Sequence, residues 1–144
     1  MPTCVNESFD TDILTEILLG NPAYAERIAQ VPPDDQMAPI VAIEEIVRGR
    51  LNTIRQAEAG KARVTLEQAY ALFEQALADL REVKVLSFTQ EAEGFLKQWR
   101  KKKIKGSTHD LRIAATCVAS SATLVTRNRR DFQRVPGLSV EFWD

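Results

Sequence analysis

The chain has 144 residues, a length typical of one compact domain with its own hydrophobic core. Hydrophobic residues make up 44% and charged residues 27% of the sequence, with 6 glycines and 6 prolines. This composition excludes collagen-like, intrinsically disordered and small disulfide-framework proteins. We expect a single domain over residues 1–144.

No apolar run approaches the roughly 18 residues that a membrane span requires. The N-terminus has neither the basic nor the apolar region of a signal peptide. The two cysteines, Cys4 and Cys117, lie far apart and lack the spacing of metal ligands. These features predict a cytoplasmic protein with reduced thiols and no membrane partner.

The net charge of −1 conceals an uneven distribution along the chain. Residues 1–94 hold 16 acidic and 8 basic side chains, whereas residues 95–144 hold 4 acidic and 11 basic ones. A basic segment can present a positive face to a polyanion, or the two parts of the chain can pair with each other. Charge alone leaves both interpretations open.

Capping residues, apolar spacing and glycine or proline breaks predict the elements of the first half of the chain. Helices are expected at residues 10–20 and 22–30, followed by a short strand at 37–40. An apolar stripe between residues 43 and 54 predicts a third helix, and a fourth is expected at 66–80.

In the second half, strands and helices alternate. Strand formers at 83–88 precede a helix that starts after Thr89 and ends in a basic run, and a further helix is expected at 111–121. Strands are expected at 122–126 and 138–142. The alternation predicts an α/β fold with a mostly parallel sheet of four or five short strands. In such sheets, ligands bind at the carboxyl ends of the strands.

Carboxylates occur where predicted strands end or helices begin. Repulsion between carboxylates in one cleft favours a bound cation, and oxygen ligands suit Mg²⁺ or Mn²⁺, which can assist phosphodiester hydrolysis. Each residue taken alone is better explained as a helix cap, a solvated helical side chain or half of a surface ion pair. The residues concerned are Asp10, Asp12, Glu44, Glu45, Asp110 and Asp131. The lone His109, with no cysteine nearby, argues against zinc.

The order of these segments resembles that of PIN-domain nucleases. Residues 9–14 (Phe-Asp-Thr-Asp-Ile-Leu) resemble the first motif of that family, and residues 42–49 resemble the second, with Glu45 at the motif position. Residues 106–115 look like the third motif, in which Asp110 opens an Ile-Ala-Ala helix, and residues 122–132 resemble the fourth. The ending, residues 135–143, is typical of the VapC-like branch, the toxins of toxin–antitoxin pairs.

This resemblance implies a PIN-like three-layer α/β/α sandwich and an endoribonuclease that depends on Mg²⁺ or Mn²⁺. It implies metal ligation by Asp10 and Asp110, with Glu45 completing the acidic pocket directly or through water. Asn128 stands where many relatives carry an acid, and Asp131 is an alternative source of that charge. Thr11 and Thr126 are expected to orient the carboxylates. A homodimer and a cognate antitoxin protein are the implied partners, and RNA is the implied substrate.

Two basic clusters flank the acidic motifs. The stretch 97–105 holds six basic residues in nine, among them Lys101, Lys102 and Lys103. The second cluster surrounds the fourth motif and includes Arg127, Arg129 and Arg130. We expect these cations to hold the phosphates of RNA, although lysines at a helix end are also explained by the helix dipole.

Two features favour a rival interpretation, a catalytically impaired PIN fold that only binds RNA or protein. One is Asn128 at the fourth position. The other is the polar stretch 4–9 before the first motif, where a central strand should be apolar. Either this strand lies at a poorly covered position, or the N-terminus is altered relative to the ancestral one. A displaced strand would misplace Asp10 and impair activity.

Overall fold

The computed structural model describes residues 6–144 and contains a parallel sheet of five strands in the order β3-β2-β1-β4-β5. The strands are short: β1 (Glu7–Phe9), β2 (Gln36–Pro39), β3 (Val85–Leu86), β4 (Thr123–Thr126) and β5 (Val140–Phe142). Because successive strands run parallel, each connection crosses back over the sheet through helices. All the carboxyl ends of the strands therefore meet at one edge.

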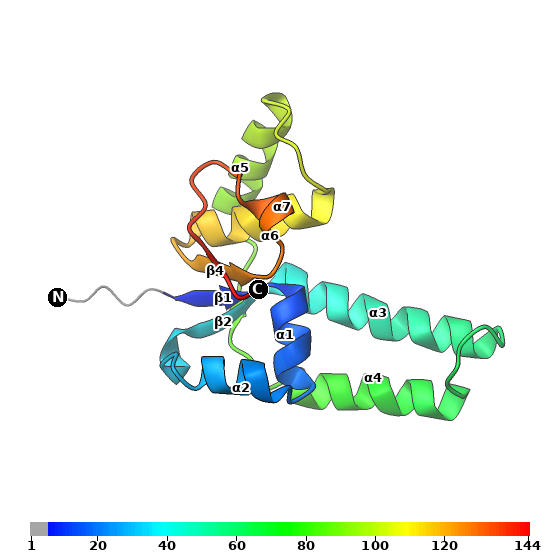
Figure 1. The fold of residues 1–144 in the computed structure, drawn as a ribbon. Helices are drawn as coiled ribbons and strands as arrows, with labels where there is room; N and C mark the ends of the chain where they lie inside the picture. Colours follow the sequence, from blue (N-terminus) through cyan, green and yellow to red (C-terminus); the bar gives the residue numbers. More distant parts are fainter. Residues whose placement is uncertain (1–5) are drawn as a thin grey trace.

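Helices cover both faces of the sheet, and the predicted three-layer α/β/α sandwich is confirmed (Figure 1). The helices are α1 (Thr11–Leu18), α2 (Pro22–Ile28), α3 (Ile40–Glu58), α4 (Leu66–Leu80), α5 (Gln90–Lys101), α6 (Thr108–Ala119) and α7 (Arg129–Phe132), with a 3₁₀ turn at Pro33–Asp35. Helices α5, α6 and α7 lie on one side of the sheet, whereas α1 and α2 lie on the other. The α3–α4 hairpin projects away from the sheet at the carboxyl ends of the strands.

The period-two alternation of the strands divides the core between the two faces. On β4, Leu124 packs with the α5–α6 layer, whereas its neighbour Val125 packs with Phe9 and Ile13 on the α1 side. Trp99 is only 3% exposed within the α5–α6 layer. The free cysteine Cys117 is fully buried there, and Cys4 lies outside the described residues.

Local capping explains why most helices begin where the sequence predicts. Thr65 and Gln68 form a reciprocal capping box at α4, and the Thr89 side chain accepts a hydrogen bond from Ala92 N at α5. Three expectations need correction. Helix α3 starts at Ile40 rather than near residue 43, α6 starts at Thr108 rather than at residue 111, and the strand expected at 83–88 is only Val85–Leu86. The short helix α7 is an additional element that the sequence analysis does not predict.

The polar first strand occupies the centre of the sheet, between β2 and β4. The expectation of a poorly covered position is wrong for residues 7–9, because Ser8 and Phe9 are buried. Residues 4 and 5 of that stretch lie outside the described residues. Ser8 is small enough to fit beneath the covering helices, and β1 leads directly into Asp10, whose backbone N–H donates to Val125 O at 2.9 Å.

No helix among the described residues is long and apolar enough to cross a membrane.

Candidate active site

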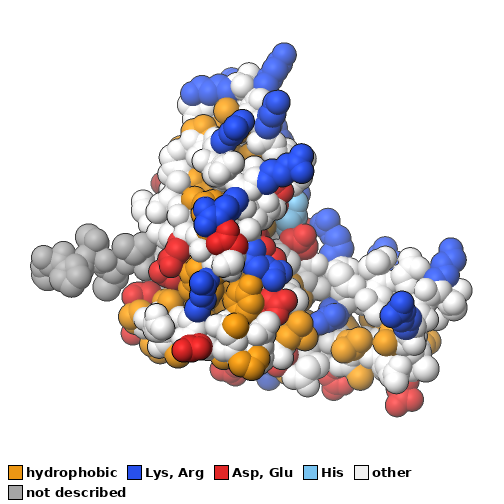
Figure 2. All heavy atoms as spheres, viewed as in Figure 1, with side chains coloured by type: hydrophobic (Ala, Val, Ile, Leu, Met, Phe, Trp, Pro, Cys, Tyr) orange, Lys and Arg blue, Asp and Glu red, His pale blue; other side chains and the backbone are white. Residues whose placement is uncertain are grey.

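The carboxyl ends of β1 and β4 bring acidic residues of four segments to one edge of the sheet. Asp10 follows β1, Glu45 lies in the second turn of α3, Asp110 in the first turn of α6, and Asp131 in α7. Figure 2 shows acidic side chains and the histidine at the junction between the α5–α6 layer and the α3–α4 hairpin. The predicted residues are thus gathered by the topology of the sheet rather than by nearness in the sequence.

Asp10 is the buried residue of this group, with 6% of its surface exposed. Its Oδ1 accepts the N–H of Thr11 at 2.8 Å, which caps α1, and its Oδ2 accepts the hydroxyl of Thr126 at 2.7 Å. Burial, the charge of Asp12 and, to a smaller extent, that of Asp110 raise the pKa of Asp10 to about 7. The Asp10 side chain therefore caps α1 and also belongs to the acidic group.

Glu45 contacts two residues that are distant from it in the sequence, Thr11 and His109. It accepts a hydrogen bond from the hydroxyl of Thr11, which lies 34 positions earlier. His109 Nε2 lies 2.8 Å from Glu45 Oε2 in a geometry that is not a hydrogen bond. A protonated imidazole would attract Glu45 by charge alone. The neighbouring Glu44 instead pairs with Arg48 at 2.7 Å on the exposed side of α3, the ordinary place for a helical glutamate.

Asp110 reaches the site from the start of α6. Ser107 caps this helix by accepting the N–H of Asp110 at 3.1 Å, which leaves the Asp110 carboxylate free to face the other acids. Gly106 supplies the turn before the cap with a φ of +151°, where a Cβ would lie 3.1 Å from Leu111. Burial and the nearby Asp131 and Glu45 raise the pKa of Asp110.

Asn128 and Asp131 form one hydrogen-bonded unit at the fourth motif. Asn128 Nδ2 donates to Asp131 Oδ2 at 2.6 Å, and Asp131 N donates back to Asn128 Oδ1 at 3.2 Å. Asn128 N in turn donates to the Thr126 hydroxyl at 3.0 Å. Within residues 6–144, Asp131 forms no ion pair with a neighbouring arginine, so its explanation as half of a surface ion pair is wrong. Asn128 thus orients Asp131, and it is Asp131 that places a charge beside Asp110.

The donor atoms of this group suit a hard divalent cation. The carboxylates supply oxygen only. Burial is the main cause of the raised pKa values of Asp10 and Asp110, neighbouring carboxylates add to it, and a bound positive charge would offset both effects. Within residues 6–144, no three His, Cys, Asp or Glu side chains are grouped closely enough to enclose a metal. This open arrangement fits Mg²⁺, which usually takes one or two carboxylates and keeps several waters.

The predicted phosphate-binding arginines are partly engaged with the protein itself. Arg127 lies 3.8 Å from both Asp12 and Glu16 and 3.3 Å from the hydroxyl of Tyr24. Arg129 pairs with Asp144 and lies over the ring of Phe142. Arg130 is exposed, as are Lys101 at the end of α5 and Lys102 and Lys103 in the turn after it.

Sequence reasoning missed the contact of His109 with Glu45. His109 directly precedes the predicted ligand Asp110, so its position in the sequence indicates that it lies near the site. Its partner, however, lies 64 positions away in the sequence, and only the packing of α6 against α3 reveals the contact.

Comparison with known proteins shows several related chains. Ribonuclease VapC2 of Rickettsia felis is 50% identical over 36 residues, which is 25% of this chain and 27% of that protein. Ribonuclease VapC1 of Haemophilus influenzae is 25% identical over 137 residues, covering 93% of this chain and 95% of that protein.

Two solved structures share the fold. The structure of VapBC2 from Rickettsia felis bound to a promoter DNA fragment has a TM-score of 0.70 at 20% identity, covering 96% of this chain and 98% of that one. A toxin–antitoxin complex from Klebsiella pneumoniae gives 0.64 at 21% identity, covering 92% and 94%.

The model of the PIN domain family matches residues 9–138. That range begins one residue before Asp10 and includes every member of the acidic group. The chain belongs to the PIN domain family.

Proposed function

We propose that the chain is an endoribonuclease that uses Mg²⁺ or Mn²⁺ to hydrolyse phosphodiester bonds. The observation that carries this proposal is the convergence of Asp10, Glu45 and Asp110 on one edge of the sheet, with the pKa values of both aspartates raised. A protein gains no stability from gathering like charges, so the arrangement is best explained by a cation and its substrate. The names of the ribonuclease relatives support RNA as that substrate.

Each side chain of the site would have a distinct task. Asp10 and Asp110 would hold the cation, and Glu45, directly or through water, would complete the pocket. Asp131, held by Asn128, would add charge at its edge. Thr126 and Thr11 fix the orientation of Asp10 and Glu45 through their hydroxyls.

When bound, the cation would activate a water and neutralise charge on the leaving oxygen. The chain's own residues would position the phosphate chain around it. The exposed lysines Lys101, Lys102 and Lys103 and Arg130 would contact other phosphates of the RNA. Arg127 and Arg129 would first have to exchange their present carboxylate partners for phosphates.

We further propose that the enzyme is the toxin of a toxin–antitoxin pair, acts in the cytoplasm and forms a homodimer. The similarity to a toxin–antitoxin complex supports an antitoxin protein as partner. An apolar groove between α1, α3 and α4, with Leu19 69% exposed at its edge, offers such a protein a surface to cover.

The test is incubation of the purified protein with a mixed pool of structured cellular RNAs in Mg²⁺, in Mn²⁺ and in EDTA. We expect discrete fragments in the presence of metal and none in EDTA. Asp110→Asn should abolish them, because it removes a charged ligand at nearly constant shape. Asp34→Asn is the matched control, since the Asp34 side chain is 97% exposed and remote from the site.

RNA that is bound but left whole under every metal condition would favour the non-catalytic binding module instead. Equal cleavage by the wild type and Asp110→Asn would point to a contaminating nuclease and would refute the proposed site. Cutting of DNA in place of RNA would change the substrate but retain the chemistry.

A further inference from the structure

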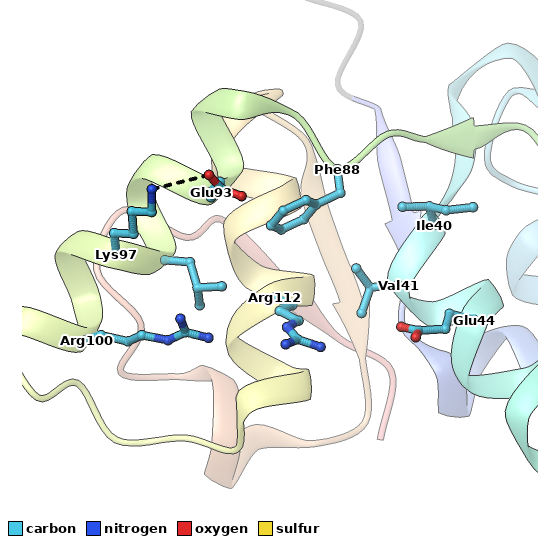
Figure 3. A pocket seen from close by; sticks show the side chains of 9 residues that line it. Ile40, Val41, Glu44, Phe88, Glu93, Lys97, Arg100 and Arg112 are labelled. Carbon is cyan, nitrogen blue, oxygen red and sulfur yellow. Dashed lines mark ion pairs between the residues drawn. The ribbon is translucent and has the colours of Figure 1, made fainter.

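Beside the acidic site lies a groove of about 690 Å³ that the catalytic proposal does not use. It runs between the start of α3, the loop before α5, and helices α5 and α6 (Figure 3). Its size falls within the range of about 300–1,000 Å³ usual for small-molecule sites. The lining residues are Ile40, Val41, Glu44, Phe88, Glu93, Leu96, Lys97, Arg100 and Arg112.

Two arginines of this groove have no acidic partner. Arg100 from α5 and Arg112 from α6 both extend into the hollow in Figure 3. Within residues 6–144, neither arginine has a carboxylate oxygen within 4.0 Å of its guanidinium nitrogens. Arg112 is half-buried, so its guanidinium is only partly hydrated. Such a pair of cations favours an anionic occupant.

The two acids of the groove do not neutralise these arginines. Glu93 pairs with Lys97 at 3.3 Å along α5, and Glu44 pairs with Arg48 at 2.7 Å along α3. Each acid is thus already balanced by a lysine or arginine of its own helix. The net positive charge of the groove comes from Arg100 and Arg112.

The remainder of the groove is apolar and includes one aromatic ring. Val41 and Leu96 are buried and form its floor, whereas Ile40 is 38% exposed on its wall. The Phe88 ring projects into the hollow from the loop before α5. Aromatic side chains next to cations are the usual means by which proteins hold unpaired bases and their phosphates.

The groove shares two helices with the acidic site. Arg112 comes two residues after Asp110 on α6, and Glu44 directly precedes Glu45 on α3. Residues two apart on a helix point to opposite sides, so the groove lies around α6 from Asp110. An RNA strand that occupies both places has to pass around this helix.

We propose that this groove is a nucleotide subsite for single-stranded RNA, in which Arg100 and Arg112 hold phosphates and Phe88 packs against a base. The proposal rests on the proposed endoribonuclease function and adds to it a place where a nucleotide of the same RNA, away from the cut bond, is held. An apolar protein partner fits the groove less well, because it would bury two arginines without a counter-charge.

The experiment measures binding of a fluorescein-labelled, random-sequence single-stranded 12-mer RNA by fluorescence anisotropy, in EDTA, at several salt concentrations. Arg100→Gln and Arg112→Gln should each reduce the slope of log K against log salt by about 0.7, the value for one phosphate contact on a single strand. Phe88→Leu keeps the apolar volume but removes the ring, and we expect it to weaken binding about 5-fold or more. Arg81→Gln, exposed at the end of α4, is the matched control and should change neither quantity.

Circular dichroism spectra like that of the wild type will show that each variant is folded. If the wild type cuts RNA and the three groove variants bind RNA as Arg81→Gln does, the proposed subsite is refuted and the proposed endoribonuclease function is retained. If the wild type neither cuts nor binds RNA, the proposed function itself fails. If the groove variants change the mass measured by light scattering but not the RNA affinity, the groove is a contact between copies, which also overturns the subsite.

Discussion

Replacing Asp10 with asparagine should stabilise the metal-free protein at neutral and alkaline pH. Burial, together with the charges of Asp12 and Asp110, raises the pKa of Asp10 from 3.8 to about 7. The folded state therefore binds this proton more tightly than the unfolded state does. By linkage, wild-type stability falls as the pH rises from about 4 to about 7.

The size of the effect follows from the pKa difference. At about 1.4 kcal/mol per pKa unit, keeping Asp10 ionised costs the folded state up to about 4 kcal/mol above pH 7. Asparagine removes this cost and is a good N-cap for α1. Asparagine has only one acceptor oxygen for the two donors Thr11 N and Thr126 Oγ1. The lost hydrogen bond lowers the stability of the variant by about 1 kcal/mol. We expect a net gain of about 2–3 kcal/mol at pH 8 that disappears near pH 4.

The assay is urea unfolding in EDTA at four pH values between 4 and 8, followed by tryptophan fluorescence. Trp99 and Trp143 are both buried, so their emission reports unfolding. The control Asp34→Asn should stay within about 0.5 kcal/mol of the wild type throughout. A gain that does not vary with pH, or an Asp10→Asn variant less stable than the wild type at pH 8, would refute the reasoning. Added Mg²⁺ should stabilise the wild type and not the variant.

Two further predictions concern the partners of the carboxylates. Thr126→Val removes the hydroxyl that donates to Asp10 Oδ2, so Mn²⁺ affinity measured by calorimetry should fall about 10-fold or more. Thr123→Val, at the other end of the same strand, should leave it unchanged, and equal losses in both variants would show a general effect on β4. Asp131→Asn removes a charge that raises the pKa of Asp110, so the acidic limb of the pH profile for RNA cleavage should move to lower pH. An unmoved profile would mean that Asp131 serves only α7.

Much of the fold was predictable because its signals are local. Helices α4, α5 and α6 begin after Thr65, Thr89 and Ser107, each of which accepts a backbone N–H of the first turn. Such caps can be identified from a few neighbouring residues. The length of β3 was not predictable in this way, because pairing limits it: only Val85 and Leu86 find partners on β2.

The polar stretch before Asp10 shows why composition misjudged β1. A strand at the centre of a sheet is expected to be apolar, yet Glu7 and Ser8 pair with β2 and β4 on both sides. In a strand of three residues, one buried aromatic, Phe9, supplies most of the apolar contact. The backbone pairing with both neighbours places this strand despite its polar composition.

The candidate site was predictable as an ordered set of motifs but not as a set of contacts. The positions of Asp10, Glu45 and Asp110 followed from the resemblance. The hydrogen bond from the Thr11 hydroxyl to Glu45 joins residues 34 positions apart, and the contact of His109 with Glu45 joins residues 64 positions apart. Nothing in the local sequence encodes these pairs, because they depend on how α1, α3 and α6 pack at one edge of the sheet.

The central place of β1 also has a consequence for biosynthesis. This strand is synthesised before its neighbour β4 and before the hydroxyl that holds Asp10, both of which come 116 positions later. Until β4 has emerged, one edge of β1 stays open and Asp10 lacks two of its partners. A nascent or prematurely terminated chain therefore has no assembled acidic cluster. Any nuclease activity of this cluster therefore depends on the synthesis of β4.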